Sequence, residues 1–396
     1  MREIVFFSIV LAVVAGLHSY LGRRLFGRRS GLERWRVLGG SGLALSALLM
    51  LIAFVGGRFL PRSSTLLTVQ YLGYLCMGLV LVLFPLTLAR DLSLGGWRAL
   101  RALLYIRMRE GPPVDPARRT FLRQVSSLGV LGSSSALATA GVIEAREVAE
   151  VRRVAIPFAG LHPDLVNLRI VQITDLHVGP ILGRAWLDEV VTTVNQRKPD
   201  LIAVTGDLVD GYVPDLRDEV GAIRRLRAPL GVFFVTGNHE YYWDAEAWVA
   251  EVQRLGLTVL LNEHRVLDVG AAKLLVAGVT DVSAGALLPA HASDPARALA
   301  GAPAVDLKLL LAHQPKSIGA AKKLGYDLQL SGHTHGGQFF PWNLVIGLFQ
   351  PLLAGLGRFQ DTWLYVSRGT GTWGPPLRTG VPSEISVIEL ARDESA

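Results

Sequence analysis

The chain has 396 residues and a formal net charge of +7, and half of its residues are apolar. Its one cysteine, Cys76, excludes a disulfide framework within the chain. The charge is uneven, because residues 1–149 carry a net charge of +11 and residues 150–396 a net charge of −4. A basic excess placed among apolar runs is typical of membrane topology, so we expect no nucleic-acid partner.

Three long apolar runs open the chain. Each is almost free of charged residues, and roughly 20 apolar residues suffice to span a bilayer as a helix. No small-residue cleavage site follows Leu21, which argues against a cleaved signal peptide. The sequence therefore predicts transmembrane spans at about residues 4–21, 37–57 and 66–89.

Arginines in the connections between these runs indicate the side of the membrane. The connection 22–36 has six arginines, the connection 58–64 has two, and the connection 90–119 has seven. Because arginine-rich loops stay in the cytoplasm, we expect the first and third connections there and the N-terminus outside. Within the third, Trp97–Arg109 mixes Arg with Leu, Tyr and Ile, which is typical either of a helix on an anionic membrane surface or of a solvated helix.

A fourth run, residues 125–143, is uncharged but rich in Ser, Gly and Ala, so it is a weaker span. Arg118 and Arg119, followed by Thr, Phe and Leu, resemble a twin-arginine export signal at an internal position. Insertion as a helix, or recognition by the twin-arginine export machinery, would place the chain after residue 144 outside the cytoplasm at the inner membrane. The alternative is an amphiphilic linker that leaves the second half in the cytoplasm. Residues 1–149 are thus predicted to form an all-α membrane region of about four helices.

The pattern changes at about residue 150. Short runs rich in β-branched residues, such as LRIVQIT and DLIAVTGD, alternate with stretches of helical periodicity at residues 186–196, 245–255 and 317–324. This alternation predicts an α/β domain with largely buried strands over residues 150–396. Nearly every strand run ends in Asp, Asn or His, and sites in open α/β sheets lie at the carboxyl ends of strands. We therefore expect these polar side chains to converge.

The residues at the strand ends form a candidate metal set. Carboxylate, imidazole and amide oxygen donors without thiolate suit borderline divalent ions such as Mn, Fe or Zn. Seven ligands that share one carboxylate would hold two ions, a known arrangement for phosphoester hydrolysis. The set comprises Asp175, His177, Asp207, Asp210, Asn238, His239, His313, His333 and His335.

The order of five sequence blocks resembles one known family. TDLHVG, GDLVD, GNHE, a lone His in LAHQP, and GHTHGGQ follow one another as in the calcineurin-like metallophosphoesterases. GHTHGGQ beside a membrane anchor resembles the bacterial membrane-associated branch of that family. The resemblance covers about residues 165–390. It implies a four-layer α-β-β-α fold, with two sheets packed face to face and helices outside, and the activity of a phosphodiesterase or phosphatase.

The resemblance also implies a role for each residue of the candidate set. One ion is held by Asp175, His177, Asp207 and His335. The other ion is held by Asp207, Asn238, His313 and His333, so that Asp207 is the bridge. A hydroxide between the ions is the nucleophile. His239 stabilises the transition state or protonates the leaving group, and Asp210 orients it. The glycines before ligands, expected to let each strand end turn sharply, are Gly206, Gly237 and Gly332.

Two further features bear on the substrate. Arg368 and Arg378 are spare cations that could hold a phosphate or diphosphate. Residues 339–359 are apolar with Pro and Gly breaks, and form either a core strand with its loop or a surface that touches lipid or admits a lipid-linked substrate. The preferred hypothesis is hydrolysis of an envelope or lipid-linked phosphoester outside the cytoplasm. The alternatives are a cytoplasm-facing pyrophosphatase of a nucleotide-linked lipid precursor and a non-catalytic, metal-binding membrane sensor.

Overall fold

The chain divides into two compact units. The computed structural model describes residues 2–28, 30–60, 62–105 and 115–393. The first unit consists of Met1–Ile143 with Gly374–Leu377, and the second of Glu144–Trp373 with Arg378–Ala396. The division falls at Glu144 rather than between residues 149 and 150. Glu144 already belongs to the second unit, where its carboxylate accepts a hydrogen bond from the backbone N–H of Gly380 at 3.2 Å.

The described part of the first unit consists mainly of long helices. They are α1 (Arg2–Leu25), α2 (Arg36–Phe59), α3 (Ser64–Tyr105) and α4 (Pro116–Arg146). Among the described residues, three helical stretches are long and apolar enough to cross a membrane: Glu33–Gly56, Ser64–Leu104 and Pro116–Arg146. The expected first span, residues 4–21, lies in α1, and several side chains at its start are outside the described residues.

Helix α3 is longer than the sequence predicted. The expected span ended at residue 89 and was followed by a separate surface helix at 97–109, whereas α3 continues to Tyr105 and contains Pro85. Gly95 and Gly96 lie inside α3 without ending it, and residues 97–105, which are mostly the strong helix formers Leu, Ala and Arg, continue the helix. Residues 106–109 of the expected surface helix lie outside the described residues.

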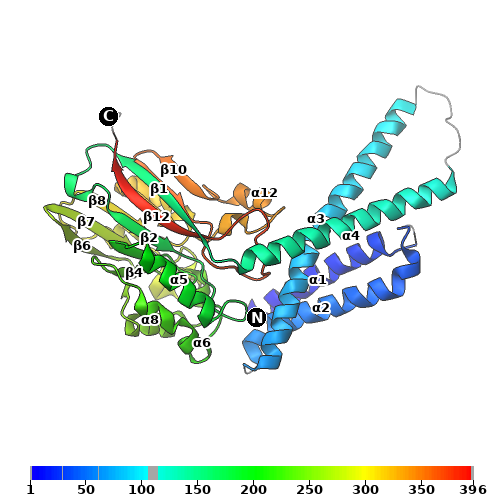
Figure 1. Cartoon of the computed structure of the whole chain (residues 1–396), viewed down its shortest axis with the longest axis horizontal. Coiled ribbons are helices and arrows are strands. Elements are labelled where there is room, and N and C mark those ends of the chain that lie inside the picture. Colours follow the sequence, from blue (N-terminus) through cyan, green and yellow to red (C-terminus); the bar gives the residue numbers. More distant parts are fainter. Residues whose placement is uncertain (1, 29, 61, 106–114, 394–396) are drawn as a thin grey trace. The chain divides into compact units, whose positions relative to one another are not determined.

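The second unit contains two six-stranded sheets among its described residues (Figure 1). In the first sheet β2, β3, β4 and β5 run parallel, and β12 pairs antiparallel with β2 and parallel with β1. In spatial order this sheet consists of β1 (Glu150–Phe158), β12 (Glu384–Arg392), β2 (Arg169–Ile173), β3 (Leu201–Val204), β4 (Val232–Phe234) and β5 (Thr258–Val259).

The second sheet has a parallel centre with antiparallel edges. Strands β11, β9, β8 and β7 are parallel, whereas β10 and β6 pair antiparallel at the two edges. In spatial order it consists of β10 (Gly355–Phe359), β11 (Thr362–Val366), β9 (Leu328–Ser331), β8 (Leu307–Leu311), β7 (Ala272–Gly278) and β6 (Glu263–Val269).

Successive residues of the central strands enter different cores, which produces four layers. Ile170 of β2 and Leu309 of β8 share the core between the sheets, whereas the neighbouring Val171 and Leu310 face outward into two other cores. Helices cover both outward faces, so the strands are buried on both sides. The main covering helices are α5 (Arg184–Gln196), α6 (Val213–Val220), α8 (Ala245–Arg254), α10 (Pro295–Leu299) and α11 (Ile318–Leu324). The predicted α-β-β-α fold is confirmed.

Short helices complete the connections at the strand ends. They are α7 (Asn238–Tyr242), α9 (Ala284–Leu287) and α12 (Asn343–Ile346). Parallel strands place their carboxyl ends at one edge of a sheet, and the expected ligands follow β2, β3 and β4 in the first sheet and β8 and β9 in the second. The topology therefore brings the ligands of both sheets to corresponding edges.

Candidate metal centre

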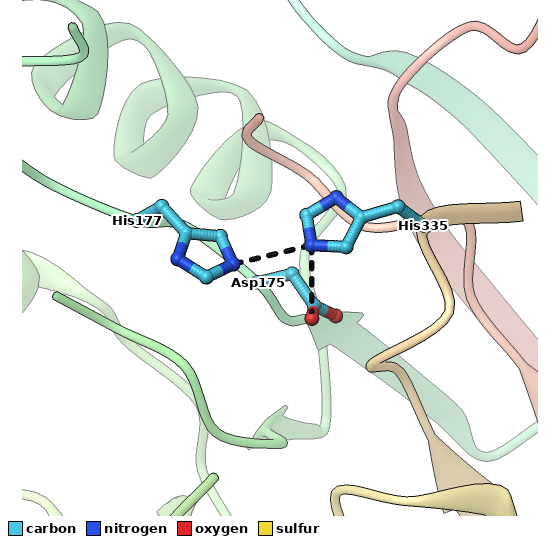
Figure 2. Close-up of side chains that lie close together, drawn as sticks. All are labelled: Asp175, His177 and His335. Atoms are coloured by element: carbon cyan, nitrogen blue, oxygen red, sulfur yellow. Dashed lines mark hydrogen bonds and ion pairs between the residues drawn. The ribbon is translucent and has the colours of Figure 1, made fainter. Parts of the chain in front are cut away.

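One cluster of potential ligands combines the loop after β2 with the loop after β9. Nε2 of His177 lies 3.1 Å from Nε2 of His335, and the same His335 nitrogen lies 3.3 Å from Oδ1 of Asp175 (Figure 2). The three side chains are buried. Two imidazole nitrogens that face each other beside a carboxylate offer lone pairs to a shared cation.

A second cluster combines the loops after β3, β8 and β9. Nε2 of His313 lies 3.2 Å from Oδ2 of Asp207 and 3.3 Å from Nδ1 of His333. Nδ1 of His313 is 2.8 Å from the carbonyl oxygen of Thr205 and donates its proton there, which leaves Nε2 as a ligand atom. The structure thus places His333 and His335 in different clusters.

Asp207 lies between the two clusters. Its Oδ2 atom lies 3.2 Å from Nε2 of His313 in the second cluster and 3.8 Å from Nε2 of His177 in the first cluster. Its Oδ1 atom accepts a hydrogen bond from the backbone N–H of His239 at 2.8 Å. The adjacent Asn238 has a buried amide oxygen without a hydrogen-bond partner among the described residues.

Asp210 lies beside two histidines and forms with them a third group of potential metal ligands. Its Oδ1 atom is 2.5 Å from Nδ1 of His239, and its Oδ2 atom is 3.2 Å from Nδ1 of His177. The contact with His239 is a hydrogen bond, whereas the contact with His177 is an ion-pair distance only, because Nδ1 of His177 has no hydrogen-bond partner among the described residues. The hydrogen bond to His239 is compatible with the orienting role expected for Asp210, which stays a prediction.

The histidines of the site differ in pKa. Burial opposes protonation of His313, but the charge of Asp207 outweighs it and raises the pKa of His313 well above its usual value, so this ligand has to give up a proton when it binds a cation. Burial lowers the pKa of His333 and of His335 to about 4, so both are neutral and can act as ligands. Burial also opposes protonation of His239, but the charges of Asp207 and Asp210 outweigh it and raise the pKa of His239 to about 9. His239 is therefore protonated at neutral pH.

The ligands sit on strained backbone. Asp175, His177, Asp207, His333 and His335 all have positive φ, between 47° and 71°. Non-glycine residues rarely adopt this left-handed conformation, which costs about 1–3 kcal/mol per residue and is concentrated at functional sites. These positive φ angles could not be predicted from the sequence, because Asp and His adopt positive φ only where the surrounding structure imposes it.

The glycines before the ligands serve two different purposes. Gly206 has φ of 88°, so it makes the sharp turn expected of it. Gly237 and Gly332 are needed for close approach instead, because a Cβ at Gly237 would collide with the Asp207 carboxylate and one at Gly332 with the Asp175 carboxylate.

Glu240 supports the centre and was not recognised from the sequence. Its buried carboxylate accepts hydrogen bonds from the backbone N–H groups of Asp207 at 3.1 Å, Leu208 at 2.7 Å and Gly237 at 2.6 Å. It lies three residues after Gly237, which caps α7, and a Glu at that distance from a helix cap is a recognisable signal. Glu240 therefore fixes the backbone around the shared ligand.

Arg378 is not the spare cation that the sequence suggested. It is fully buried, and its guanidinium donates to the carbonyl oxygens of Arg368 at 2.7 Å, His335 at 3.1 Å and Gly371. These bonds fix the loop that carries a ligand and leave the guanidinium unavailable to a phosphate. The side chain of Arg368 is 30% exposed, with Nε 3.8 Å from a carboxylate oxygen of Glu384, and its role toward a phosphate stays a prediction.

The donor set fits divalent ions. Facing imidazole nitrogens, a carboxylate between two clusters and the unpartnered amide oxygen of Asn238 are hard to satisfy by hydrogen bonds alone, whereas they match the ligand preferences of Mn, Fe or Zn. The residues that could hold the ions are Asp175, His177, Asp207, Asn238, His313, His333 and His335. Fold and site together define a metal-dependent hydrolytic centre.

Comparison with known proteins places this centre in a family. The model of the calcineurin-like phosphoesterase family matches residues 168–337. A transmembrane protein with metallophosphoesterase domain from Bos taurus is 35% identical over 333 residues, 80% of this chain and 72% of that protein. An uncharacterized metallophosphoesterase of Campylobacter jejuni is 34% identical over 278 residues, 70% of this chain and 72% of that one. The chain belongs to the calcineurin-like metallophosphoesterase family and is a metal-dependent phosphoesterase.

Among solved structures, a 5′-nucleotidase precursor from Thermus thermophilus aligns with a TM-score of 0.35 and 17% identity. The alignment covers 52% of this chain and 49% of that protein.

Proposed function

We propose that the chain is a membrane-anchored hydrolase that uses two divalent ions, Mn, Fe or Zn, to cleave a phosphoester. The shared carboxylate is the observation that carries the proposal. Oδ2 of Asp207 lies 3.2 Å from the ligand nitrogen of His313 and 3.8 Å from that of His177, and these two histidines belong to different clusters. A carboxylate with an imidazole on either side suits a bridge between two ions.

The ions and the protein have separate tasks in this proposal. Divalent ions held by these ligands would supply the positive charge that phosphoryl transfer needs and would acidify water, so that a hydroxide nucleophile is available near neutral pH. The protein holds the ligand side chains in place through Glu240 and Arg378. It also excludes bulk water from the buried ligands.

His239 provides the proton for the leaving group. Asp210 fixes its Nδ1 atom, and its protonated Nε2 atom lies 4.0 Å from Oδ2 of Asp207, at the shared ligand. A proton held there is positioned to pass to an oxygen that leaves phosphorus. A membrane sensor that only binds metal would need neither His239 nor Asp210, which favours the hydrolase.

The membrane tether favours a substrate in the envelope or linked to a lipid. Three apolar helical stretches and the arginine distribution support a multi-pass protein of the inner membrane, with the catalytic unit outside the cytoplasm. In that case the membrane lipids, the phosphoester and, for export, the twin-arginine machinery are the expected partners. The second candidate is a cytoplasm-facing pyrophosphatase of a nucleotide-linked lipid precursor, which the same centre could serve.

Metal removal and add-back test the hydrolase. The full chain, purified in detergent, is treated with a chelator and reconstituted separately with Mn, Fe or Zn. We expect hydrolysis of an aryl phosphodiester or monoester to disappear with the chelator and to return with at least one metal. Absence of hydrolysis with every metal, for both substrates, would contradict the proposal.

Protease accessibility tests the side of the membrane. A tag after Ala396 is exposed to protease in spheroplasts before and after permeabilisation. Cleavage before permeabilisation is expected, and it should be lost when Arg118→Lys and Arg119→Lys are combined if the twin arginines act as an export signal. Protection until permeabilisation would favour the cytoplasmic pyrophosphatase.

A further inference from the structure

The loop of residues 338–353, which directly follows the ligand His335, exposes apolar side chains. Leu344, Leu348 and Phe349 are 66%, 79% and 68% exposed, respectively. Residues 339–357 contain no charged side chain. The sequence left residues 339–359 open between a core strand with its loop and a lipid-facing surface. Residues 355–359 form the strand β10, with Phe359 packed against the outer core of the second sheet, whereas the loop before this strand exposes the three side chains named above. We call residues 338–353 the apolar loop.

The apolar loop is folded and is fixed at both ends to the segment that carries the histidine ligands. At its start, the loop packs against the backbone just after His335, because a Cβ at Gly337 would collide with Asn343, and within the loop the backbone N–H of Asn343 donates to the carbonyl oxygen of Phe339 at 3.2 Å. At its end, the hydroxyl of Thr334, between the ligands His333 and His335, donates to the carbonyl oxygen of Leu353 at 2.6 Å. The exposed side chains are thus held at a defined place beside the metal centre.

A lipid bilayer lies within reach of this unit through the covalent chain. Helix α4 is long and apolar enough to cross a membrane and ends at Arg146, and β1 begins at Glu150. An extended residue spans about 3.5 Å, so the first strand begins within roughly 15 Å of the end of α4. Glu144, in the last turn of α4, bonds to Gly380, two residues after the buried Arg378 that fixes the His335 loop.

We propose that the apolar loop inserts into the lipid surface and holds the metal centre at the level of the lipid headgroups. A segment with Trp and Phe, aliphatic side chains and no charge suits that depth, because aromatic residues favour the membrane interface and aliphatic ones the acyl region. Contiguous apolar side chains exposed on a protein surface usually mark a site of contact with a membrane or another molecule. The preferred substrate, which rests on the proposed function, is then a phosphoester in the headgroup of a membrane lipid or lipid-linked precursor.

Insertion can be measured in the full chain without turnover. In a Cys76→Ser background, Leu348→Cys is labelled with the fluorophore NBD, and the protein is reconstituted into phosphatidylcholine vesicles that contain doxyl-labelled lipid. The matched control is Asp361→Cys, an exposed residue before β11. Because β11 is parallel to β9, Asp361 lies at the edge of the sheet opposite to the ligands. We expect the doxyl lipid to quench the label at position 348 at least twofold more than the label at position 361.

The outcomes separate insertion from its alternatives. Equal quenching at both positions overturns the proposal. Quenching that depends on the protein-to-lipid ratio and not on doxyl lipid overturns it too, and assigns the loop to a contact with a second copy. Strong doxyl quenching at position 348 in a protein that hydrolyses no phosphoester would leave insertion standing while the proposed function fails.

A second variant links insertion to the substrate. Leu348→Glu combined with Phe349→Glu places two charges on side chains that are exposed in water, so folding should be retained. We expect hydrolysis of a vesicle-embedded lipid phosphoester, relative to a water-soluble aryl phosphodiester, to fall at least tenfold. An unchanged ratio would show that the loop does not deliver lipid substrates to the centre.

Discussion

The two sheets contribute different chemistry to one centre. Loops of the first sheet supply the carboxylates, the amide, the imidazole of His177 and the protonated His239, whereas loops of the second sheet supply three imidazoles and no carboxylate to the ligand set. The residues that hold the ligand-bearing loops in place also differ between the two sheets. The first sheet uses Glu240, an acceptor that binds backbone N–H groups, and the second uses Arg378, a donor that binds backbone carbonyls.

The two sheets therefore differ in the charge that their side chains bring to the metal centre. The first sheet carries both the negative charge for cations and the proton for the leaving group, and its neighbouring acids raise the pKa of His239 to about 9. The second sheet contributes only imidazoles to the ligand set: burial lowers the pKa of His333 and of His335 to about 4, whereas the charge of Asp207 raises the pKa of His313 despite its burial. We therefore expect changes in the first sheet to affect catalysis more strongly than changes in the second.

The largest effect is expected from Asp207→Asn. This variant removes the charge shared by both clusters, and metal ions supply several kcal/mol of transition-state stabilisation, so the loss of activity should be on the order of 1000-fold or more. Elemental analysis should show a lower metal content, and circular dichroism of the full chain serves as the control for folding. Retained metal content together with retained activity would contradict a bridging role.

Loss of the proton donor separates catalysis from metal binding. In His239→Asn the proton donor is missing while the ligands remain, so kcat should fall by about 100- to 10,000-fold. Metal content, measured on the same sample, should equal that of the wild type. A phosphoester whose leaving group needs no proton, such as one with a 4-nitrophenyl group, should be affected less than an alkyl ester. Equal losses for both esters would argue against a role for His239 as proton donor.

The pH dependence should shift when the partner of His239 is neutralised. His239 is active in its protonated form, so kcat/KM should fall as pH rises through its pKa, which is no higher than about 9 and is lowered further by bound cations. Asp210 raises this pKa, so Asp210→Asn should move the alkaline limb of the profile to lower pH by about 1 unit or more. The same raised pKa predicts that the contribution of His239 to stability is present below about pH 6.5 and is lost as pH rises toward 9. An alkaline limb that stays in place in Asp210→Asn would contradict this coupling.

The sequence predicts the ligands better than their supports, for physical reasons. Asp175, Asp207 and His335 lie two, three and four residues after the ends of β2, β3 and β9, so local pattern and topology suffice to bring them together. Glu240 and Arg378 act on backbone groups that meet only in the folded sheets, and Arg378 is 43 residues away from His335. Interpreted from the sequence alone, a lone arginine near a phosphate site looks like a substrate ligand.

The apolar loop and α3 are two further segments whose structure could not be predicted fully from the sequence. Apolar composition does not distinguish a buried segment from one that faces lipid, so residues 339–359 were left open until the exposure of Leu348 was known. The end of α3 was misplaced because the charged residues that end an apolar span do not end a helix: Asp91, Gly95 and Gly96 lie inside α3, and helix formers continue to Tyr105. The alternation of short strand runs with helical stretches, by contrast, predicted the α/β domain, and the resemblance of the five sequence blocks to a known family implied its four layers, which the three separate cores of the structure show.

Replacing Glu240 tests the support of the first sheet. In Glu240→Gln one carboxylate oxygen becomes an amide N–H₂ that faces backbone N–H groups of Asp207, Leu208 or Gly237. A buried N–H left without an acceptor costs about 1–3 kcal/mol, and loss of such an orienting partner typically lowers metal affinity by about 10- to 100-fold. Metal titration of the apo full chain, with the exposed Glu246→Gln in α8 as a matched control, should show this decrease. Unchanged affinity would indicate that the ligands hold their own loops.

The smallest effect is expected from Arg378→Lys, which retains the charge and loses the planar fork. A lysine cannot reach the carbonyls of His335, Arg368 and Gly371 together. A buried carbonyl oxygen that loses a hydrogen-bond donor destabilises a protein less than a buried N–H group that loses its acceptor. The free energy of unfolding should therefore fall by about 1 kcal/mol, the lower end of the range for Glu240→Gln. For a unit of this size that corresponds to a decrease of about 2–4 °C in the midpoint of thermal unfolding, with metal affinity changed less than in Glu240→Gln. Weaker metal binding in Arg378→Lys than in Glu240→Gln would contradict this order. It would indicate that metal affinity depends more on the exact position of the His335 imidazole than on the position of the Asp207 carboxylate.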